Sequence, residues 1–289
     1  MGELIAASTA GGVEHVRVFL QAGIEPGAKD AYDALICAAK NGHEGVMQAL
    51  PEAGAAVDSR NHHGQTALVV AAQYGQAGAM RVLLVAGAAV DSITDDRQTA
   101  LMMASFNGHT GAVRVLLEAG ADTDFKTKNG WAAFMCAAKN GHEGVMRVLL
   151  EAGAVVDSKN NDAVALLLAS MYGHEGAMRL LLEAGAALDS IDKHGRTALI
   201  KASFNGHTGA VRVLLEAGAE IDWKEKNGWA ALMCAAKLGH EGVLQALLAA
   251  GAEVDLKDNP GHTALLVAAV YGHEGAMRLL LEAGQRWIR

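Results

Sequence analysis

The sequence predicts an all-α solenoid: about nine helix pairs stacked in a row and joined by short β-hairpin-like turns. Three observations predict it. A glycine recurs at steps of 33 residues, with one step of 32, at Gly42, Gly75, Gly108, Gly141, Gly173, Gly206, Gly239 and Gly272. Each period holds two short apolar segments that end at a glycine, and Asp, Asn and Gly fill the stretch between periods. Neither segment could bury its apolar face alone, so stacked neighbours must supply the core.

The unit from residues 66 to 98 shows how each element is justified. TALVVAAQYG (66–75) is densely apolar and stops at a glycine, as a helix often does. GAMRVLLVAG (78–87) repeats the pattern and predicts a second helix. The connecting stretches, such as AAVDSRNHHGQ, carry turn residues. We expect a single array over 1–289, with a degenerate first unit at 1–29, full units over 30–284 and a tail at 285–289.

A longer period of three repeats lies above the single unit. The eighteen letters ASFNGHTGAVRVLLEAGA occur at 104–121 and again at 202–219. The cysteines Cys37, Cys136 and Cys234 are 99 and 98 residues apart, in equivalent surroundings. A cassette of three repeats has therefore been copied along the chain, either by gene duplication or by design.

The repeat pattern G-x-T-A-L-x-x-A-A-x-x-G-H-x-x-x-V-x-x-L-L-x-A-G-A-x-V-D resembles the ankyrin repeat over essentially the whole chain. Two departures stand out: the family's T-P-L-H reads T-A-L followed by an apolar residue, and its final Asn is usually Asp here. The resemblance implies that the Gly-His histidines make hydrogen bonds within and between turns. It also implies that the turns and first helices form a concave face on which family members bind proteins.

Composition excludes several function classes. The net charge of -8 gives no basic face for general nucleic-acid binding. We see neither a signal-peptide pattern nor an apolar run of the roughly 18 residues that span a bilayer. Three distant cysteines predict small core residues rather than disulfides. We expect an intracellular protein of the cytoplasm or nucleus, monomeric unless its ends associate.

Catalytic and metal sites are not predicted. Neighbouring repeats are roughly 10 Å apart, whereas ligands that share a zinc ion each sit about 2 Å from it, so one histidine per repeat cannot form a shared site. Every Ser-His pair recurs with the repeat and lacks an orienting acid in register. The sequence predicts no enzyme and no cofactor.

Aromatic residues gather at a few repeat positions, either before the first helix or at its end. We expect them to anchor a partner, because aromatic side chains are favoured at interfaces; the competing interpretation is that they fill gaps between repeats. The candidate partner-binding residues are Tyr32, Tyr74, Phe106, Trp131, Lys139, Tyr172, Arg196, Phe204, Trp229, Lys237 and Tyr271.

The lysines near two tryptophans refine the partner class. Lys139 follows Trp131, and Lys237 follows Trp229, in duplicated surroundings. A basic, aromatic strip suits a protein or extended peptide that is acidic or phosphorylated. Two alternatives stay open: a repeat scaffold without a fixed ligand, and a nucleotide or oligonucleotide binder. Interspersed acidic residues weaken the last.

Two places depart from the repeat pattern in ways that bear on stability: Pro51 and the last unit. Pro51 stands where other second helices have leucine, which predicts a weak second unit because proline disrupts a helix interior. The last unit keeps an apolar pattern where a terminal cap should be polar. Trp287 and Ile288 could fold back over it, the array could have been cut from a longer one, or ends could stack between molecules.

Overall fold

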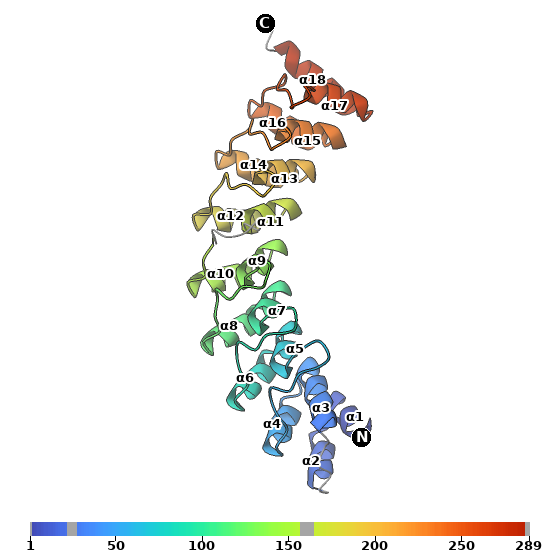
Figure 1. Ribbon diagram of the computed structural model, residues 1–289, viewed down its shortest axis with the longest axis vertical. Helices are drawn as coiled ribbons and strands as arrows, with labels where there is room; N and C mark the ends of the chain where they lie inside the picture. The colour runs from blue at the N-terminus through green and yellow to red at the C-terminus, as the bar shows by residue number, and fades with distance from the viewer. Residues whose placement is uncertain (1, 22–27, 157–164, 287–289) are drawn as a thin grey trace. The chain divides into compact units, whose positions relative to one another are not determined.

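The computed structural model describes residues 2–21, 28–156 and 165–286, and these form helix pairs joined by turns (Figure 1). No strand occurs within these ranges. The helices are α1 Gly2–Thr9, α2 Val13–Gln21, α3 Ala28–Asn41, α4 Glu44–Glu52, α5 Ala67–Gln73, α6 Ala77–Val85, α7 Ala100–Phe106, α8 Thr110–Glu118, α9 Ala133–Lys139, α10 Glu143–Glu151, α11 Ala165–Tyr172, α12 Glu175–Glu183, α13 Ala198–Phe204, α14 Thr208–Glu216, α15 Ala231–Leu238, α16 Glu241–Ala249, α17 Ala264–Val270 and α18 Glu274–Arg286. The predicted pairing of a first and a second helix in each repeat is confirmed.

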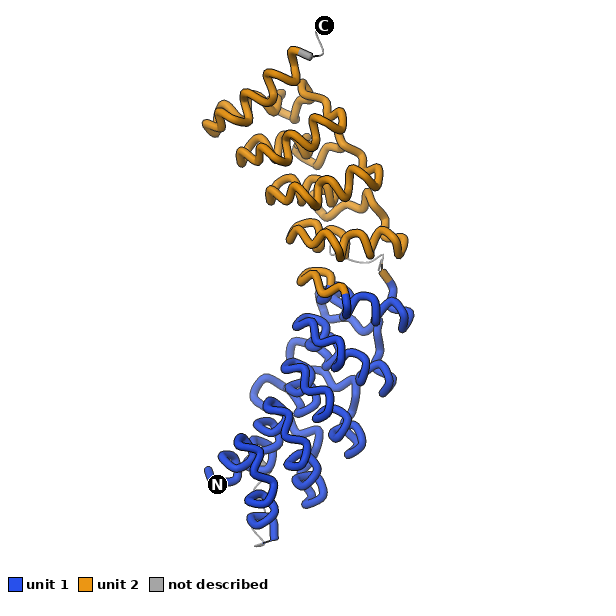
Figure 2. The backbone as a smooth tube through the Cα atoms, turned by 180° about the vertical axis from the view of Figure 1, so that it is seen from behind, with its two compact units in different colours: residues 1–137, 144–155 blue, residues 138–143, 156–289 orange. Residues whose placement is uncertain are grey.

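The chain divides into two compact units, residues 1–137 with 144–155 and residues 138–143 with 156–289 (Figure 2). In the first unit, α1, α3, α5 and α7 pack in sequence, and α2, α4, α6 and α8 form a second layer against them. In the second unit, α11, α13, α15 and α17 form one layer, and α12, α14, α16 and α18 form the other. Each unit is thus a two-layer stack with its apolar core between the layers.

Gly-His pairs join neighbouring repeats within each unit. Gly75 ends a first helix with a positive φ of 72°. A Cβ added there would lie 2.7 Å from the His109 ring of the next repeat, so only glycine fits. The His109 ring nitrogen Nε2 in turn lies 3.0 Å from the carbonyl oxygen of Gln73. For His109, the hydrogen bond between repeats that the family resemblance implies is confirmed.

The same joint recurs along the stack. The ring nitrogens of five further histidines lie 2.9–3.1 Å from a carbonyl at the end of the preceding first helix, in the pairs His43–Thr9, His174–Lys139, His207–Met171, His240–Phe204 and His273–Lys237. Gln76, the one residue that replaces histidine in this ladder, donates its side-chain amide to the carbonyl of Lys40 at 3.1 Å. Polar joints of this kind satisfy helix-end carbonyls that would otherwise lack a partner.

The Asp that replaces the family's final Asn also joins repeats. Asp58 accepts the backbone N–H of Ala89 at 3.1 Å, and Asp222 accepts that of Glu253 at 3.1 Å. A carboxylate oxygen serves as well as an amide oxygen for this bond, so the departure from the family pattern is compatible with the fold.

Threonines begin several first helices. Thr66, Thr99, Thr197 and Thr263 each accept a backbone N–H three residues ahead, as a helix N-cap does.

No helix within the described ranges is both long and apolar enough to cross a membrane.

The two irregularities noted in the sequence, Pro51 and the apolar last repeat, both lie within described helices. Pro51 lies in the last turn of α4, one residue before its end, beside a pocket lined by Gln48, Arg81, Val82 and Val85. In the last repeat, Leu266 and Val270 are 46% and 72% exposed, although the equivalent of Leu266 is buried in the six repeats before it. Trp287 and Ile288 lie outside the described residues.

Candidate functional site

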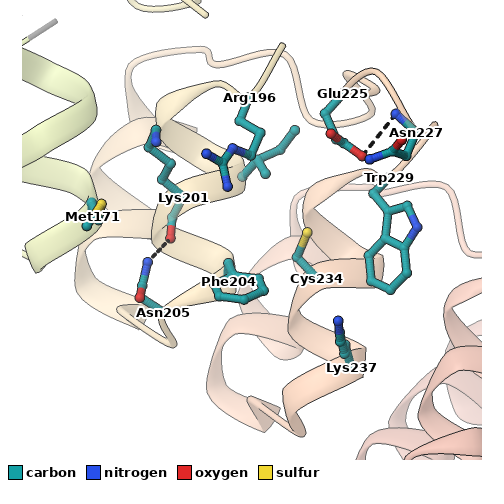
Figure 3. Close-up of a pocket in the computed structure, with 11 residues that line it drawn as sticks. Met171, Arg196, Lys201, Phe204, Asn205, Glu225, Asn227, Trp229, Cys234 and Lys237 are labelled. Atoms are coloured by element: carbon teal, nitrogen blue, oxygen red, sulfur yellow. Dashed lines mark hydrogen bonds between the residues drawn. The ribbon is translucent and has the colours of Figure 1, made fainter. Parts of the chain in front are cut away.

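A pocket of about 470 Å³ opens on the turn and first-helix side of the second unit. Its walls come from the first helices α11, α13 and α15 and from the turns before α13 and α15 (Figure 3). It is lined by Met171, Arg196, Ile200, Lys201, Phe204, Asn205, Glu225, Asn227, Trp229, Cys234 and Lys237. Four of the candidate partner-binding residues therefore meet here: Arg196, Phe204, Trp229 and Lys237.

Hairpin-like turns position Arg196 and Trp229. Each turn is closed by backbone hydrogen bonds, from Asp192 N–H to the Arg196 carbonyl and from Glu225 N–H to the Trp229 carbonyl, both at 3.0 Å. A further bond of 3.1 Å, from Lys226 N–H to the His194 carbonyl, ties the two turns together. The Trp223 indole N–H adds a 2.8 Å bond to the carbonyl of Gly195. These bonds hold the two side chains in a fixed register.

A charge cluster of Asp192, Arg196 and Lys201 forms one side of the site. Oδ2 of the buried Asp192 lies 2.8 Å from an Arg196 terminal nitrogen and 2.9 Å from Lys201 Nζ. Oδ1 of Asp192 accepts the backbone N–H groups of His194 and Arg196 at 2.9 and 3.0 Å. Burial raises the pKa of Asp192, but the hydrogen bonds from Lys201 and Arg196 outweigh it and hold that pKa below its usual value. The carboxylate is therefore ionised at neutral pH.

Trp229 and Lys237 form the other side. Lys237 Nζ lies 5.3 Å from the centre of the Trp229 ring and 5.4 Å from that of Tyr271. Both distances allow a cation–π interaction, which orders the ammonium without removing it from solvent. Phe204 is 45% exposed at the end of α13, so an apolar ring edge also faces solvent at the pocket.

Similar lysine–aromatic pairs recur with the three-repeat period. Lys139 Nζ lies 5.7 Å from the Tyr172 ring centre in the second unit. Lys40 Nζ lies 5.1 Å from the Tyr74 ring centre in the first unit. Each lysine follows the letters CAA near the end of a first helix, and each tyrosine belongs to the next repeat.

The other three candidate residues all belong to the first unit. Phe106 is 43% exposed at the end of α7, and Trp131 is partly exposed in the turn before α9. Tyr32 is buried, and its hydroxyl donates to the Gln65 carbonyl at 3.3 Å. Burial and the nearby Asp33 carboxylate raise its pKa. Tyr32 thus packs within the core and offers little surface to a partner, unlike the other candidate aromatics.

Lys201 and Lys40 were missed by sequence reasoning, and for Lys201 a signal was available. The repeat that shares the copied eighteen residues carries Met103 where this one carries Lys201. It also carries Thr94 and Gln98 in place of Asp192 and Arg196. Comparison of the two copies, rather than the search for what all repeats share, would have found the charge cluster.

Possible metal ligands and cysteine thiols are distributed as follows within the described ranges. No group of three or more His, Cys, Asp or Glu side chains there could hold a metal ion. Cys136 and Cys234 are buried, as predicted, whereas Cys37 is partly exposed. Burial, with the nearby Glu225, raises the pKa of the Cys234 thiol to about 12, so it stays protonated in the pocket wall.

Comparison with known proteins agrees with the repeat geometry. The sequence profile described as "Ankyrin repeats (3 copies)" matches residues 4–93, 77–160, 156–224 and 217–287. The crystal structure of the human ASB11 ankyrin repeat domain superposes with a TM-score of 0.71 at 27% identity, covering 76% of this chain and 98% of that one. No relative is found among curated proteins. Ankyrin repeats are generally protein–protein interaction modules without enzymatic activity. The chain belongs to the ankyrin repeat family.

Proposed function

We propose that this chain is a non-enzymatic interaction module that binds a protein or extended peptide along its turn and first-helix face. The observation that carries the proposal is the set of partly exposed aromatic side chains paired with lysines on that face, at Lys40–Tyr74, Lys139–Tyr172 and Lys237–Trp229–Tyr271. Large rings that stay partly exposed contribute strongly to an interface when a partner covers them.

The charge of this face favours an acidic or phosphorylated partner. Each of these pairs presents an ammonium group beside a ring, although the chain as a whole carries a net charge of -8. A ligand that meets both the ring and the ammonium gains apolar burial and charge complementarity together. The carboxylates of Glu225 and Asp192 at the same site disfavour an oligonucleotide, whose phosphates they would repel.

A binding experiment with matched variants tests the proposal. Ligands are selected with the intact chain from cell extract and from a random-peptide library, and their affinities are measured for the parent, Trp229→Ala and Arg212→Ala. Arg212 lies exposed on α14 in the same unit, on the opposite layer from the first helices. We expect Trp229→Ala to weaken binding and Arg212→Ala to leave it unchanged. Equal binding by all three proteins, each shown to be folded, would contradict the proposal.

A further inference from the structure

The charge cluster of Asp192, Arg196 and Lys201 breaks the periodicity of the array. The position of Lys201 on its first helix is occupied in other repeats by apolar residues or cysteine, at Cys37, Val70, Met103, Cys136, Leu168, Cys234 and Val267. Solenoid packing therefore has no need of a lysine there. In the sister repeat, where eighteen successive residues are the same, the three equivalent positions hold the uncharged residues Thr94, Gln98 and Met103.

The cluster holds more cationic groups than its own carboxylate requires. Asp192 carries one negative charge, and its carboxylate is contacted by both Arg196 and Lys201. An ammonium has three N–H donors and a guanidinium has five, so the contacts to Asp192 use only part of them. The Lys201 side chain is 14% exposed and that of Arg196 is 42% exposed. Both line the pocket, where partial burial strengthens their attraction to an anion.

We propose that this pocket binds the carboxylate of a partner's glutamate or aspartate between Arg196 and Lys201, with Trp229 and Phe204 covering the adjacent apolar atoms. The proposal rests on the proposed interaction function and identifies which part of a partner this one pocket selects. Asp192 then acts as a positioning residue: it orients the two cations and leaves their remaining donors for the ligand.

A carboxylate fits better than a phosphate on the balance of charge. Arg196, Lys201 and Lys237 line the pocket, but Asp192 neutralises one of these charges and Glu225 faces the same space. Glu225 is held there by accepting the N–H of Asn227 at 3.1 Å. What remains is a single positive charge, which one carboxylate neutralises, whereas the dianion of a phosphate monoester would leave the pocket with a net negative charge beside the Glu225 carboxylate.

The pocket itself is tested with a blocked glutamate and without any partner protein. The indole N–H signal of Trp229, identified by its loss in Trp229→Phe, is followed by NMR during titration with N-acetyl-glutamate N-methylamide at constant ionic strength. N-acetyl-glutamine N-methylamide is the neutral control. The control protein is Asp192→Thr/Arg196→Gln/Lys201→Met, which carries the residues of the sister repeat. We expect a saturable shift with the acid, and binding at least about ten-fold weaker for the amide or for the triple variant.

The outcomes that overturn the proposal are distinct. Absence of a saturable shift with the acid, or equal binding of acid and amide, removes the carboxylate site. Tighter binding of the similarly blocked O-phosphoserine assigns the pocket to a phosphate instead. An unchanged affinity of the folded triple variant shows that the charge cluster serves only the turn.

A double-mutant cycle between a peptide ligand and the protein separates this inference from the proposed function. For a peptide selected from the random library, a Glu→Gln change in the peptide is combined with the triple variant of the protein. We expect the peptide change to cost about ten-fold or more with the parent and little with the triple variant. A peptide that needs Trp229 but shows no such coupling would leave the interaction function intact and overturn the carboxylate site. If the blocked glutamate binds but the selected peptides bind Trp229→Ala as tightly as the parent, the carboxylate site is supported and the proposed interaction function is contradicted.

Discussion

The ammonium group of Lys201 lies 2.9 Å from the carboxylate of Asp192, a side chain that is only 5% exposed. The contact joins the turn before α13 to the middle of that helix, in a repeat whose sister copy has Thr94 and Met103 at the same places. An ion pair that one copy has and the other lacks is a feature of this site and not of the fold. Its effects on stability and on binding can therefore be measured against a variant that carries the residues of the sister repeat.

The first prediction concerns the pH dependence of stability. The pKa of Asp192 is depressed in the folded chain, so the unfolded chain binds its proton first as pH falls, and the stabilisation is present above the ordinary value of 3.8. It is lost as pH drops below about 4 towards the depressed pKa. We expect the free energy of unfolding of the parent to fall more steeply between about pH 5 and 3 than that of Asp192→Thr/Arg196→Gln/Lys201→Met. Urea unfolding at a series of pH values measures this, and parallel curves would contradict it.

The histidine ladder gives a second prediction. His207 Nε2 lies 3.1 Å from the carbonyl of Met171, and Gln76 reaches an equivalent carbonyl with its side-chain amide. We expect His207→Ala to lower the free energy of unfolding by about 1 kcal/mol or more, because a helix-end carbonyl loses its partner. His207→Gln should recover most of that loss by making the bond that Gln76 makes. Thermal and urea unfolding of the two variants would show whether the bond or the ring itself matters.

Much of this fold could be predicted from the sequence, because the repeat fixes which residues face the core and where the chain turns. The helix at 67–73 lies within the segment TALVVAAQYG (66–75), and the helix at 77–85 begins one residue before the segment GAMRVLLVAG (78–87). The pocket was harder to predict, because a search for residues that all repeats share overlooks any residue that departs from the repeat pattern. Lys201 is the example: its contact with Asp192 spans a turn and a helix, and no periodic signal reports it. Tyr32 illustrates the same limit, because its repeat position resembles that of Trp131 and Trp229 while its burial differs.

The proline in α4 supplies a third prediction. Pro51 lies inside the last turn of that helix and cannot donate a hydrogen bond to the preceding turn. We expect Pro51→Leu to raise the melting temperature, both by restoring that donor and by placing a larger side chain against Val82 and Val85 beside it. Pro51→Ala is the control that restores the donor alone. A melting temperature that is unchanged or lower in Pro51→Leu would show that the helix end accommodates proline without cost.

Thiol reactivity gives a fourth prediction. Burial raises the pKa of Cys234 to about 12, and Cys136 is also buried, whereas Cys37 is partly exposed. Since the thiolate is the reactive form, we expect iodoacetamide to modify Cys37 first in the native protein and Cys234 only after unfolding. Peptide mass spectrometry after timed labelling gives the order. Rapid labelling of Cys234 in the folded chain would mean that the pocket wall opens.

The measurement that tests the central claim most directly is the affinity of a selected partner or peptide for Trp229→Ala, with Arg212→Ala as the matched control on the other layer. If the turn and first-helix face is the binding surface, removal of the Trp229 ring costs about 2 kcal/mol, or roughly thirty-fold in Kd, and removal of Arg212 changes nothing. If Trp229→Ala loses stability yet binds as tightly as the parent, the ring is a packing residue and the binding face lies elsewhere.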